Sequence, residues 1–336
     1  MKIKITSSAS FTSVQDMGRP FWRSSGVPSG GAADATSHRI ANFLTANPAT
    51  AATLEVAGGG LKAVIEKPGR LAHTGPGGIL FLNKKEIPGN RPVFAPEGAV
   101  LEIKPAPGGH YSYLATPGGW DVPMVLGSRS TCFSAGFGGF QGRILRRGDV
   151  LESLNPSDKP RLPVEHHFST DIRTGAWYAG YRIFPRPALS GTTIRVLPGP
   201  EIICWNEASQ TRFFDTAFTV TAGRDRMGVR LGGASVPPSL KTEMLSTAVM
   251  PGTIQVPPDG QPLVLMADAQ TTGGYPRIAC VIAADIPLFA QIPAGHTVQF
   301  QKVTLEEAEQ LLFERENMLR KIQLALRFKL PDYGIR

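Results

Sequence analysis

Short apolar segments rich in β-branched residues recur along the whole chain, and each is bounded by glycine- or proline-rich turns. The chain has 37 glycines and 29 prolines among its 336 residues. This excess over average usage has no fixed period, so it does not indicate a collagen-like or low-complexity chain. Segments of this kind and spacing are typical of sheets that close into barrels or sandwiches. We therefore expect an all-β protein, mainly strands with a few helices.

Two stretches carry helical patterns. Residues 34–46 begin at Asp34, a candidate N-cap, and have one apolar face. Residues 304–328 predict a long C-terminal helix, because Thr304 and Glu307 are spaced as a capping box before apolar residues at steps of three and four. We expect this stripe to cover the chain's own core, with self-association through it as the alternative. The stripe consists of Leu305, Ala308, Leu312, Leu319, Ile322 and Leu326.

A proline-rich, polar stretch without periodic pattern, residues 152–190, predicts a linker or excursion between two lobes. The expected organisation is a β-rich N-terminal lobe with one helix (1–151) and a C-terminal β-barrel lobe (191–303). A C-terminal helix and tail (304–336) follow.

Metal binding is not expected. Cys132, Cys204 and Cys280 lie far apart and form no CxxC pair. His166 and His167 are adjacent on an extended segment, so their side chains would point to opposite sides. Buried free thiols and a surface histidine pair are the expected outcomes.

The formal charge is +8, from 35 lysines and arginines against 27 acidic residues. No run of five basic residues and no aromatic-basic signature occurs, so we do not expect nucleic acid as a partner. Scattered arginines suit small anions instead. The N-terminus has no signal-peptide pattern and no apolar run is long enough to span a bilayer, so we expect a cytoplasmic protein without a membrane partner.

Several strong motifs are missing from the sequence. There is no Gly-Lys pair and hence no Walker A loop, and no GxSxG, HExxH or complete GxGxxG. No lysine lies between two methionines, the usual setting of attached biotin. We therefore expect no cofactor bound by this chain alone.

Four polar, glycine-rich clusters separate the ordinary strands. They contain QDMGR (15–19), LGSRST with GGFQGR (126–143), DRMGVRL (225–231), and GTIQVPPDGQP with TTGGYP (252–276). In this order they resemble the biotin-dependent carboxyltransferase family, also called allophanate hydrolase subunit 2, whose members include KipA and the C subunit of 5-oxoprolinase. The resemblance extends from Phe11 to about Phe300. It implies cyclophilin-like β-barrel lobes and a KipI-like partner.

The resemblance implies three functions. We expect the first, in which the chain acts as the C subunit of a bacterial 5-oxoprolinase. There it would work with an ATP-using A subunit, together with a KipI-like B subunit, in opening 5-oxoproline to L-glutamate. The second is a carboxyltransferase component that moves a carboxyl group from carboxybiotin to urea. The third is a KipA-type regulator that binds a KipI-like kinase inhibitor without catalysis.

The two enzymatic functions handle a planar amide or ureido group beside an anion. Arginine suits the anion, because its planar fork binds carboxylate or phosphate bidentately and stays charged. Ion pairs with nearby Asp16, Asp149 or Asp225 are the alternative. The arginines within the matching motifs are Arg19, Arg129, Arg143, Arg226 and Arg230.

Gln255, Gln270 and Tyr275 offer neutral donors and acceptors for an amide, and Thr271 adds a hydroxyl, although a turn between two strands would also explain this cluster. Asp268 follows an apolar strand and is the candidate acid or base.

Ser128 belongs to a possible hydroxyl nest for an anion, with hydrogen bonding across a bend as the alternative for its neighbours Ser130 and Thr131. His38 is a second candidate base, although a helical histidine of this kind is more commonly half-exposed and solvated. We assign Arg129, Gln255 and Asp268 to catalysis. Substrate binding is assigned to Arg19, Ser128, Arg143, Arg226, Arg230, Gln270, Thr271 and Tyr275.

Overall fold

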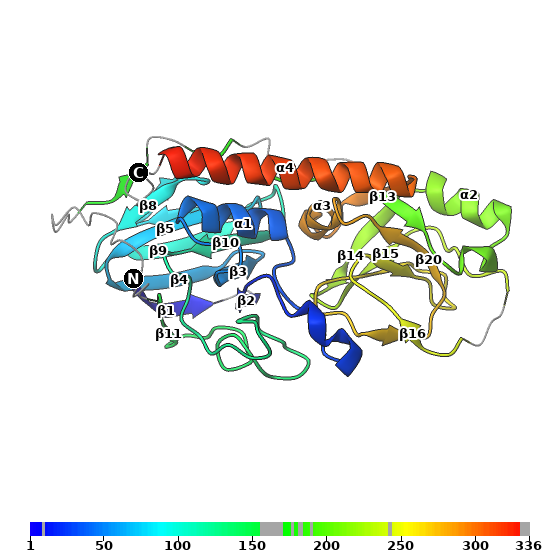
Figure 1. Cartoon of the computed structure of the whole chain (residues 1–336), viewed down its shortest axis with the longest axis horizontal. Helices are drawn as coiled ribbons and strands as arrows, with labels where there is room; N and C mark the ends of the chain where they lie inside the picture. The colour runs from blue at the N-terminus through cyan, green and yellow to red at the C-terminus, as the bar shows by residue number, and fades with distance from the viewer. Residues whose placement is uncertain are drawn as a thin grey trace. The chain divides into compact units, whose positions relative to one another are not determined.

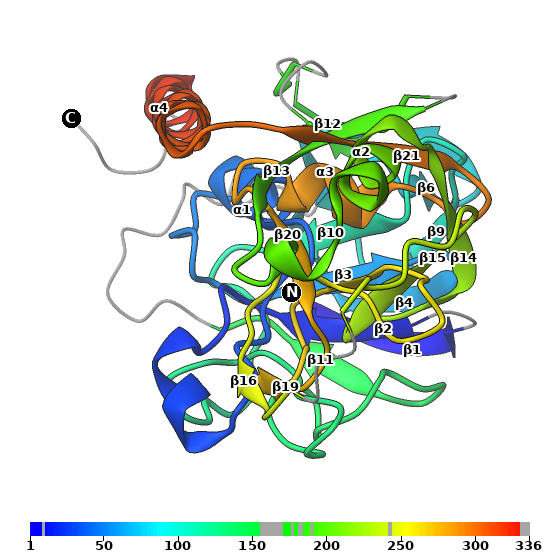
Figure 2. The same cartoon turned by 90° about the vertical axis from the view of Figure 1, so that its right-hand side faces the viewer.

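The computed structural model describes residues 1–8, 11–154, 171–175, 178–180, 184–188, 191–240 and 244–329. The chain forms two compact units, coloured along the chain in Figures 1 and 2. Unit 1 consists of Met1–Gly18, Ala35–Pro185 and Glu316–Arg336, and unit 2 of Arg19–Asp34 and Arg186–Arg315. The early segment Arg19–Asp34 thus belongs with the later barrel. Most of the predicted linker 152–190, including His166 and His167, lies outside the described residues.

Unit 1 contains two six-stranded sheets in which neighbouring strands are antiparallel. The first runs in the order β11 (Val150–Glu152), β1 (Lys2–Ser8), β4 (Leu61–Lys67), β9 (Val100–Pro105), β6 (Gly78–Leu82) and β7 (Lys85–Ile87). The second runs in the order β12 (Arg173–Thr174), β8 (Pro92–Ala95), β5 (Gly69–Thr74), β10 (Tyr111–Ala115), β3 (Thr53–Ala57) and β2 (Phe11–Gln15).

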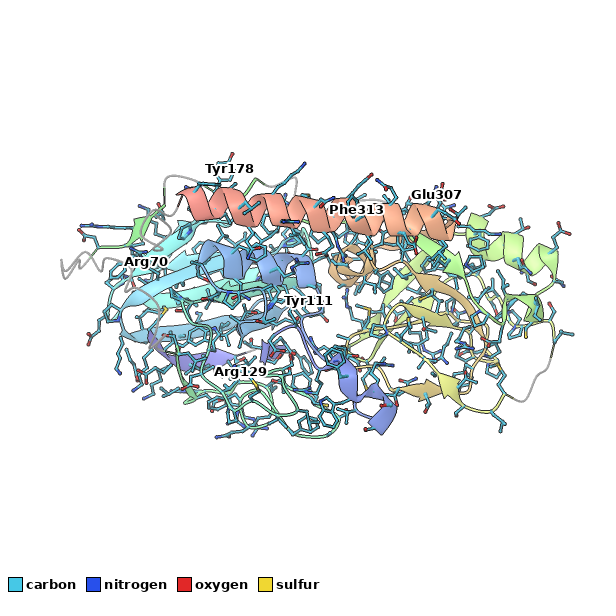
Figure 3. All side chains as sticks on the ribbon, viewed as in Figure 1. Arg70, Tyr111, Arg129, Tyr178, Glu307 and Phe313 are labelled. Atoms are coloured by element: carbon cyan, nitrogen blue, oxygen red, sulfur yellow. The ribbon has the colours of Figure 1, made fainter. Side chains whose placement is uncertain are left out.

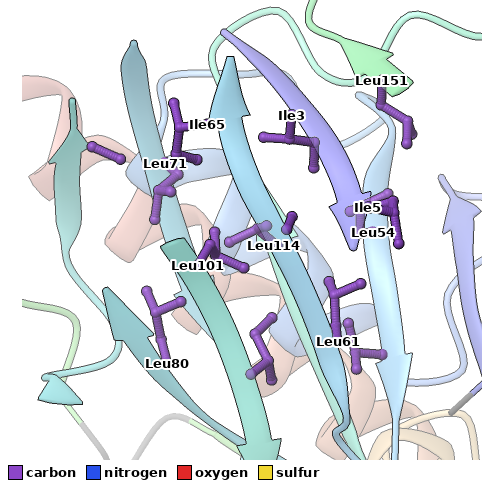
Figure 4. Packing of buried hydrophobic residues seen from close by; sticks show 14 of the residues in the cluster. Ile3, Ile5, Leu54, Leu61, Ile65, Leu71, Leu80, Leu101, Leu114 and Leu151 are labelled. Carbon is purple, nitrogen blue, oxygen red and sulfur yellow. The ribbon is translucent and has the colours of Figure 1, made fainter. Parts of the chain in front are cut away.

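The core of unit 1 lies between these two sheets. Along β4, every second residue is buried, so Leu61 and Ile65 share one face. Opposite Leu61 on β9 stands Ile103 in register. Leu54 and Leu114 come from the second sheet and join the same cluster, as Figure 4 shows. Alternating strands thus form a two-layer sandwich.

Helix α1 (Ala35–Leu44) covers the other face of the second sheet. On β5, Leu71 points into the sandwich core, whereas the next residue, Ala72, packs in the cluster under α1. Leu319 and Leu326, near the C-terminus of the chain, complete that second cluster.

Unit 2 is a closed barrel whose strands pair antiparallel, except that the first strand, β13, pairs in parallel with the last, β21. Helix α2 (Glu207–Asp215) packs on β21 through the Phe213 ring, which stacks on Phe300 with centroids 5.0 Å apart. The barrel order is β13 (Thr192–Pro198), β20 (Arg277–Val281), β17 (Thr253–Gln255), β18 (Leu263–Leu265), β15 (Gly228–Gly232), β14 (Phe218–Arg224) and β21 (Thr297–Lys302). The unit also contains 3-10 helices η1 (Pro20–Ser25) and η3 (Ile202–Cys204), helix α3 (Ile286–Gln291), and a ribbon of β16 (Thr247–Ala248) and β19 (Thr272–Gly273).

The predicted C-terminal helix is α4 (Leu305–Lys329), and its capping box is confirmed. The Thr304 backbone N–H donates to the Glu307 carboxylate at 2.8 Å, and the Glu307 N–H donates to the Thr304 hydroxyl at 3.2 Å. Leu305 departs from the expected stripe and is 56% exposed, because packing begins one turn later, at Ala308. Mainly β structure with few helices and a long C-terminal helix is therefore confirmed. No helix among the described residues is long and apolar enough to cross a membrane.

Candidate functional site

In unit 1, a buried carboxylate organises the first motif cluster. Oδ1 of Asp16, just after β2, accepts hydrogen bonds from the hydroxyls of Ser128 and Ser130, both at 2.6 Å, and from the Gly18 backbone N–H at 2.7 Å. Its Oδ2 accepts from the backbone N–H of Arg129 at 2.6 Å. Asp16 thus holds the 128–130 turn against the end of β2. The Ser128 hydroxyl is used inside this network, and its contact with a substrate stays a prediction.

The side chain of Arg129, labelled in Figure 3, is an open cation of the second motif cluster. Its Nε donates to the Val122 carbonyl at 3.1 Å, and none of the described carboxylates pairs with its guanidinium. Arg143, by contrast, binds both oxygens of Asp149 at 2.7 and 2.9 Å. Hydrogen bonding to Asp149 raises the pKa of Arg143. Of these two arginines, Arg129 has the donors left for an anion.

His38 is fully buried under α1, not half-exposed and solvated as the sequence suggested. The reason is that the helix face carrying it lies on the second sheet. Its ring nitrogens lie 2.8 Å from the Thr53 hydroxyl and 2.9 Å from the Ala49 carbonyl. Burial lowers the pKa of His38 to about 4, and burial does the same for His73. Both imidazoles are therefore neutral near pH 7.

In unit 2, Arg226 and Asp268 form a buried pair. Their side chains are 8% and 3% exposed, and Nε and Nη2 of Arg226 contact the two Asp268 oxygens at 2.8 and 2.9 Å. Arg226 Nη2 also donates to the Gly31 carbonyl at 2.6 Å. The pair therefore holds a distant segment against the end of β18. In the structure, this guanidinium binds the Asp268 carboxylate. The role of Asp268 as an acid or base stays a prediction.

The segment held in this way is a loop closed at its own base. The Arg19 N–H donates to the Ser29 carbonyl at 2.7 Å, which brings the two ends of the loop together. The Gly30 N–H donates to the Ala267 carbonyl at 3.0 Å, one residue before Asp268. Helix η1 lies between these ties, and Arg19 itself is buried.

Gln255, at the end of β17, is fully buried beneath the TTGGYP turn. Its Nε2 donates to the Tyr275 carbonyl at 3.2 Å, while its Oε1 has no partner among the described residues. A Cβ added at Gly273 would lie 2.6 Å from Gln255 Nε2, so a larger residue here would displace the Gln255 side chain. Tyr275, in the same turn, is 47% exposed.

Beside this turn lies an open hollow of about 510 Å³, made by unit 2 alone. Thr271, predicted from sequence, contributes to its wall. Arg23 was not singled out, because it lies between the first matching motif and the glycine-rich run that follows. The hollow is lined by Arg23, Ser24, Gly26, Ala248, Val249, Met250, Thr271 and Thr272.

The structure thus divides the sequence-predicted residues between the two units. Ser128, Arg129 and Arg143 are in unit 1. Arg230 forms an ion pair with Asp259 at 2.7 Å on the surface of unit 2, and an exposed pair of this kind contributes little to stability. The others in unit 2 are Arg19, Arg226, Gln255, Asp268, Gln270, Thr271 and Tyr275.

In the described ranges, no three or more His, Cys, Asp or Glu side chains are grouped so that they could hold a metal ion. Cys132 and Cys204 are buried and Cys280 is partly buried, all as free thiols.

Comparison with known proteins defines the class of this chain. The family described as "Carboxyltransferase domain, subdomain A and B" matches residues 25–302, and the chain belongs to it. It is 40% identical to the 5-oxoprolinase C subunit of Escherichia coli K12 over 306 residues, covering 91% of this chain and 93% of that protein. It is 35% identical to the 5-oxoprolinase C subunit of Haemophilus influenzae, covering 96% and 97%.

A solved structure has the same fold. The crystal structure of the K. lactis urea amidolyase superposes with a TM-score of 0.85 at 27% identity and covers 96% of this chain. This chain spans 20% of that larger enzyme.

Proposed function

We propose that this chain is the C subunit of a 5-oxoprolinase, an enzyme component that acts with other subunits in the ATP-dependent opening of 5-oxoproline to L-glutamate. The observation that carries the proposal is the 40% identity to a 5-oxoprolinase C subunit that extends over nearly all of both chains. In this reaction, water adds across the lactam C–N bond while hydrolysis of ATP supplies the driving force.

The chemistry of the site supports this proposal. The substrate is a cyclic amide with a carboxylate, so it needs groups that bind an amide and a cation that binds an anion. In unit 2, the Oε1 of Gln255 has no partner among the described residues and can accept from an amide N–H. In unit 1, Arg129 offers guanidinium donors to an anion of the reaction, a carboxylate or a phosphate.

Partners are part of the proposal. The sequence contains no Walker A loop for ATP and no lysine set as a biotin site. We therefore assign ATP to the A subunit of the complex, with direct binding expected to a KipI-like B subunit. This chain binds no cofactor by itself under the proposal.

The test is glutamate release from 5-oxoproline and ATP by this chain co-expressed with 5-oxoprolinase A and B subunits. The same mixture without this chain is the control. Glutamate formed only in the complete mixture supports the proposal, and a folded, complete complex that forms none refutes it.

Variants of the complex sharpen the result. Arg129→Gln removes the positive charge of this side chain and is expected to lower kcat/KM about tenfold or more. The reason is that a hydrogen bond to a charged group contributes about 1.5–3 kcal/mol to binding. Arg146→Gln changes an exposed arginine of the same unit and serves as the matched control. Equal losses in both variants would remove Arg129 from the site.

A carboxyltransferase component is the second candidate, favoured by the structural match to a urea amidolyase. Its test is carboxyl transfer from carboxybiotin to urea by the complex. If neither activity is found and the chain binds the KipI-like protein alone, a KipA-type regulator becomes the better proposal.

A further inference from the structure

The hollow in unit 2 has a mixed wall. Polar groups come from the Arg23 guanidinium and the hydroxyls of Ser24, Thr271 and Thr272. Ala248, Val249 and Met250 supply the apolar part of the wall. At about 510 Å³ it has the size and composition of a site for a small molecule that carries both a polar group and an apolar body.

Arg23 brings a positive charge to this wall. Its Nη1 donates to the Ser29 hydroxyl at 3.3 Å and its Nη2 to the Val249 carbonyl, and both acceptors are neutral. No carboxylate in the described part of the chain pairs with it. Four other arginines of unit 2 form ion pairs: Arg195 with Asp285, Arg226 with Asp268, Arg230 with Asp259 and Arg277 with Glu201. Arg224, like Arg23, donates to backbone carbonyls.

Partial burial without a counter-charge is unfavourable for a cation. Burial lowers the pKa of Arg23, with no carboxylate acting in the opposite direction. A guanidinium in this situation gains free energy when an anion enters beside it. The hollow therefore favours a negatively charged ligand.

The guanidinium is also held in position before any ligand arrives. The Arg23 carbonyl accepts from the Gly26 N–H at 3.0 Å and closes the 3-10 turn of η1. Its side chain is tied to Ser29 on the same loop and to Val249 on the opposite wall. A preorganised donor loses little conformational entropy on binding.

The number of charges selects the class of anion. A single arginine with neighbouring hydroxyls matches one negative charge, and its planar fork matches the planar carboxylate. A phosphate dianion would bring two charges to one cation. The apolar wall at Val249 and Met250 suits a small hydrocarbon body or ring behind the carboxylate.

We propose that the Arg23 hollow binds the carboxylate of a small monoanionic molecule, with Arg23 as the charged anchor and Ser24, Thr271 and Thr272 as hydroxyl partners. The proposal rests on the proposed function only for the natural ligand, which would be 5-oxoproline.

The test is calorimetric titration of the full chain with 5-oxoproline, acetate, the neutral lactam 2-pyrrolidinone and inorganic phosphate. Arg23→Gln keeps donors but removes the charge. Arg212→Gln changes an exposed arginine on α2 in the same unit, away from the hollow, and is the matched control. We expect 5-oxoproline to bind the wild type and Arg212→Gln equally and Arg23→Gln about 10- to 100-fold more weakly. Arg23→Lys should recover part of the loss.

Three results of the titration would overturn the proposal. They are equal binding of 5-oxoproline to Arg23→Gln and wild type, binding of 2-pyrrolidinone as tight as that of 5-oxoproline, and Arg23-dependent binding of phosphate that is tighter than that of either carboxylate. Because a variant can misfold, hydrogen exchange of the wild type is measured as well. Added 5-oxoproline should protect residues 20–27, 247–252 and 270–273, and protection elsewhere alone also overturns the proposal.

The two proposals fail separately. If the complete complex forms no glutamate but carboxylate binding still depends on Arg23, only the proposed function is lost. If the complex forms glutamate and Arg23→Gln leaves the KM for 5-oxoproline unchanged, the Arg23 site is lost while the function remains.

Discussion

Each unit uses one buried carboxylate to hold a distant loop, but the two carboxylates are satisfied differently. In unit 1, Asp16 accepts four hydrogen bonds from hydroxyls and backbone N–H groups. In unit 2, Asp268 faces a single guanidinium, that of Arg226. The first arrangement spreads one charge over neutral donors, whereas the second buries two charges that depend on each other. In both units an acidic motif residue holds the chain together, while Arg129 and Arg23 have no carboxylate partner among the described residues.

Breaking the charged pair of unit 2 should have the largest effect. Arg226→Gln leaves Asp268 buried without its counter-charge, and we expect a loss of about 3–5 kcal/mol in the free energy of unfolding. Urea denaturation followed by circular dichroism measures this loss. Arg230→Gln breaks an exposed pair and should cost less than about 1 kcal/mol. The double variant Arg226→Met with Asp268→Leu should be more stable than Arg226→Gln, and the reverse order would contradict this account.

The neutral network of unit 1 should be less sensitive. Asp16→Asn keeps one acceptor oxygen but turns an N–H₂ group toward hydrogen-bond donors, so we expect a loss of about 2–3 kcal/mol. The exposed Asp121→Asn is the control for the change of charge. A loss at Asp16 as large as that of Arg226→Gln, measured in the same denaturation series, would remove the distinction between the two arrangements.

Acid should also distinguish the units, because the two histidines with lowered pKa values are both in unit 1. The pKa of about 4 for His38 and His73 lies below the ordinary 6.5, so the unfolded state binds more protons between these values. Stability therefore falls as pH falls through this window. We expect a loss of about 2 kcal/mol between pH 6 and pH 5 from the two groups together.

Thermal unfolding across pH 4.5–7.5 measures this loss, with hydrogen exchange to locate it. His38→Gln should flatten the dependence, and exchange should rise first in peptides of unit 1. An unchanged pH profile in the double variant of His38 and His73 would contradict the assignment.

The smallest effect is expected at the cap of α4. Thr304→Ala removes the acceptor for the Glu307 N–H and should cost about 1 kcal/mol. Glu307→Gln preserves the capping box and should be close to neutral. Helix content and melting temperature of the two variants provide the measurement, and equal losses would show that the charge at Glu307 stabilises the helix as much as the Thr304 hydroxyl does.

The sequence predicted what depends on nearby residues. The capping box of α4 and the alternation along β4 are set within a few positions, and both are confirmed. The predictions that failed depend on residues that are distant in the chain. The pattern of α1 shows that it has an apolar face, but burial of His38 depends on a sheet formed elsewhere in the chain.

The sequence predicted an ion pair only where the partner is near in the chain: Asp149 was offered as a partner, and it binds Arg143, six positions away. The partner of Arg226 was not predicted. Asp225 adjoins Arg226 and looked like its partner, yet its carboxylate caps the following turn by accepting from the N–H groups of Met227 and Gly228 at 2.7 and 2.9 Å. The true partner, Asp268, comes 42 positions later and is brought close by the antiparallel pairing of β15 with β18. Arg23 was missed for a similar reason, because the hollow that it lines is completed by Val249 and Thr271, which are distant in the chain.

The parallel pairing of β13 with β21 fixes an order of events during synthesis. The barrel cannot close until Thr297–Lys302 has left the ribosome, since that strand joins both β13 and β14. The loop Arg19–Asp34, made among the first residues, must wait for Arg226 and Asp268 before it can dock. A nascent chain that stalls before residue 297 would therefore leave one edge of β13 and one edge of β14 unpaired, and unpaired strand edges favour aggregation.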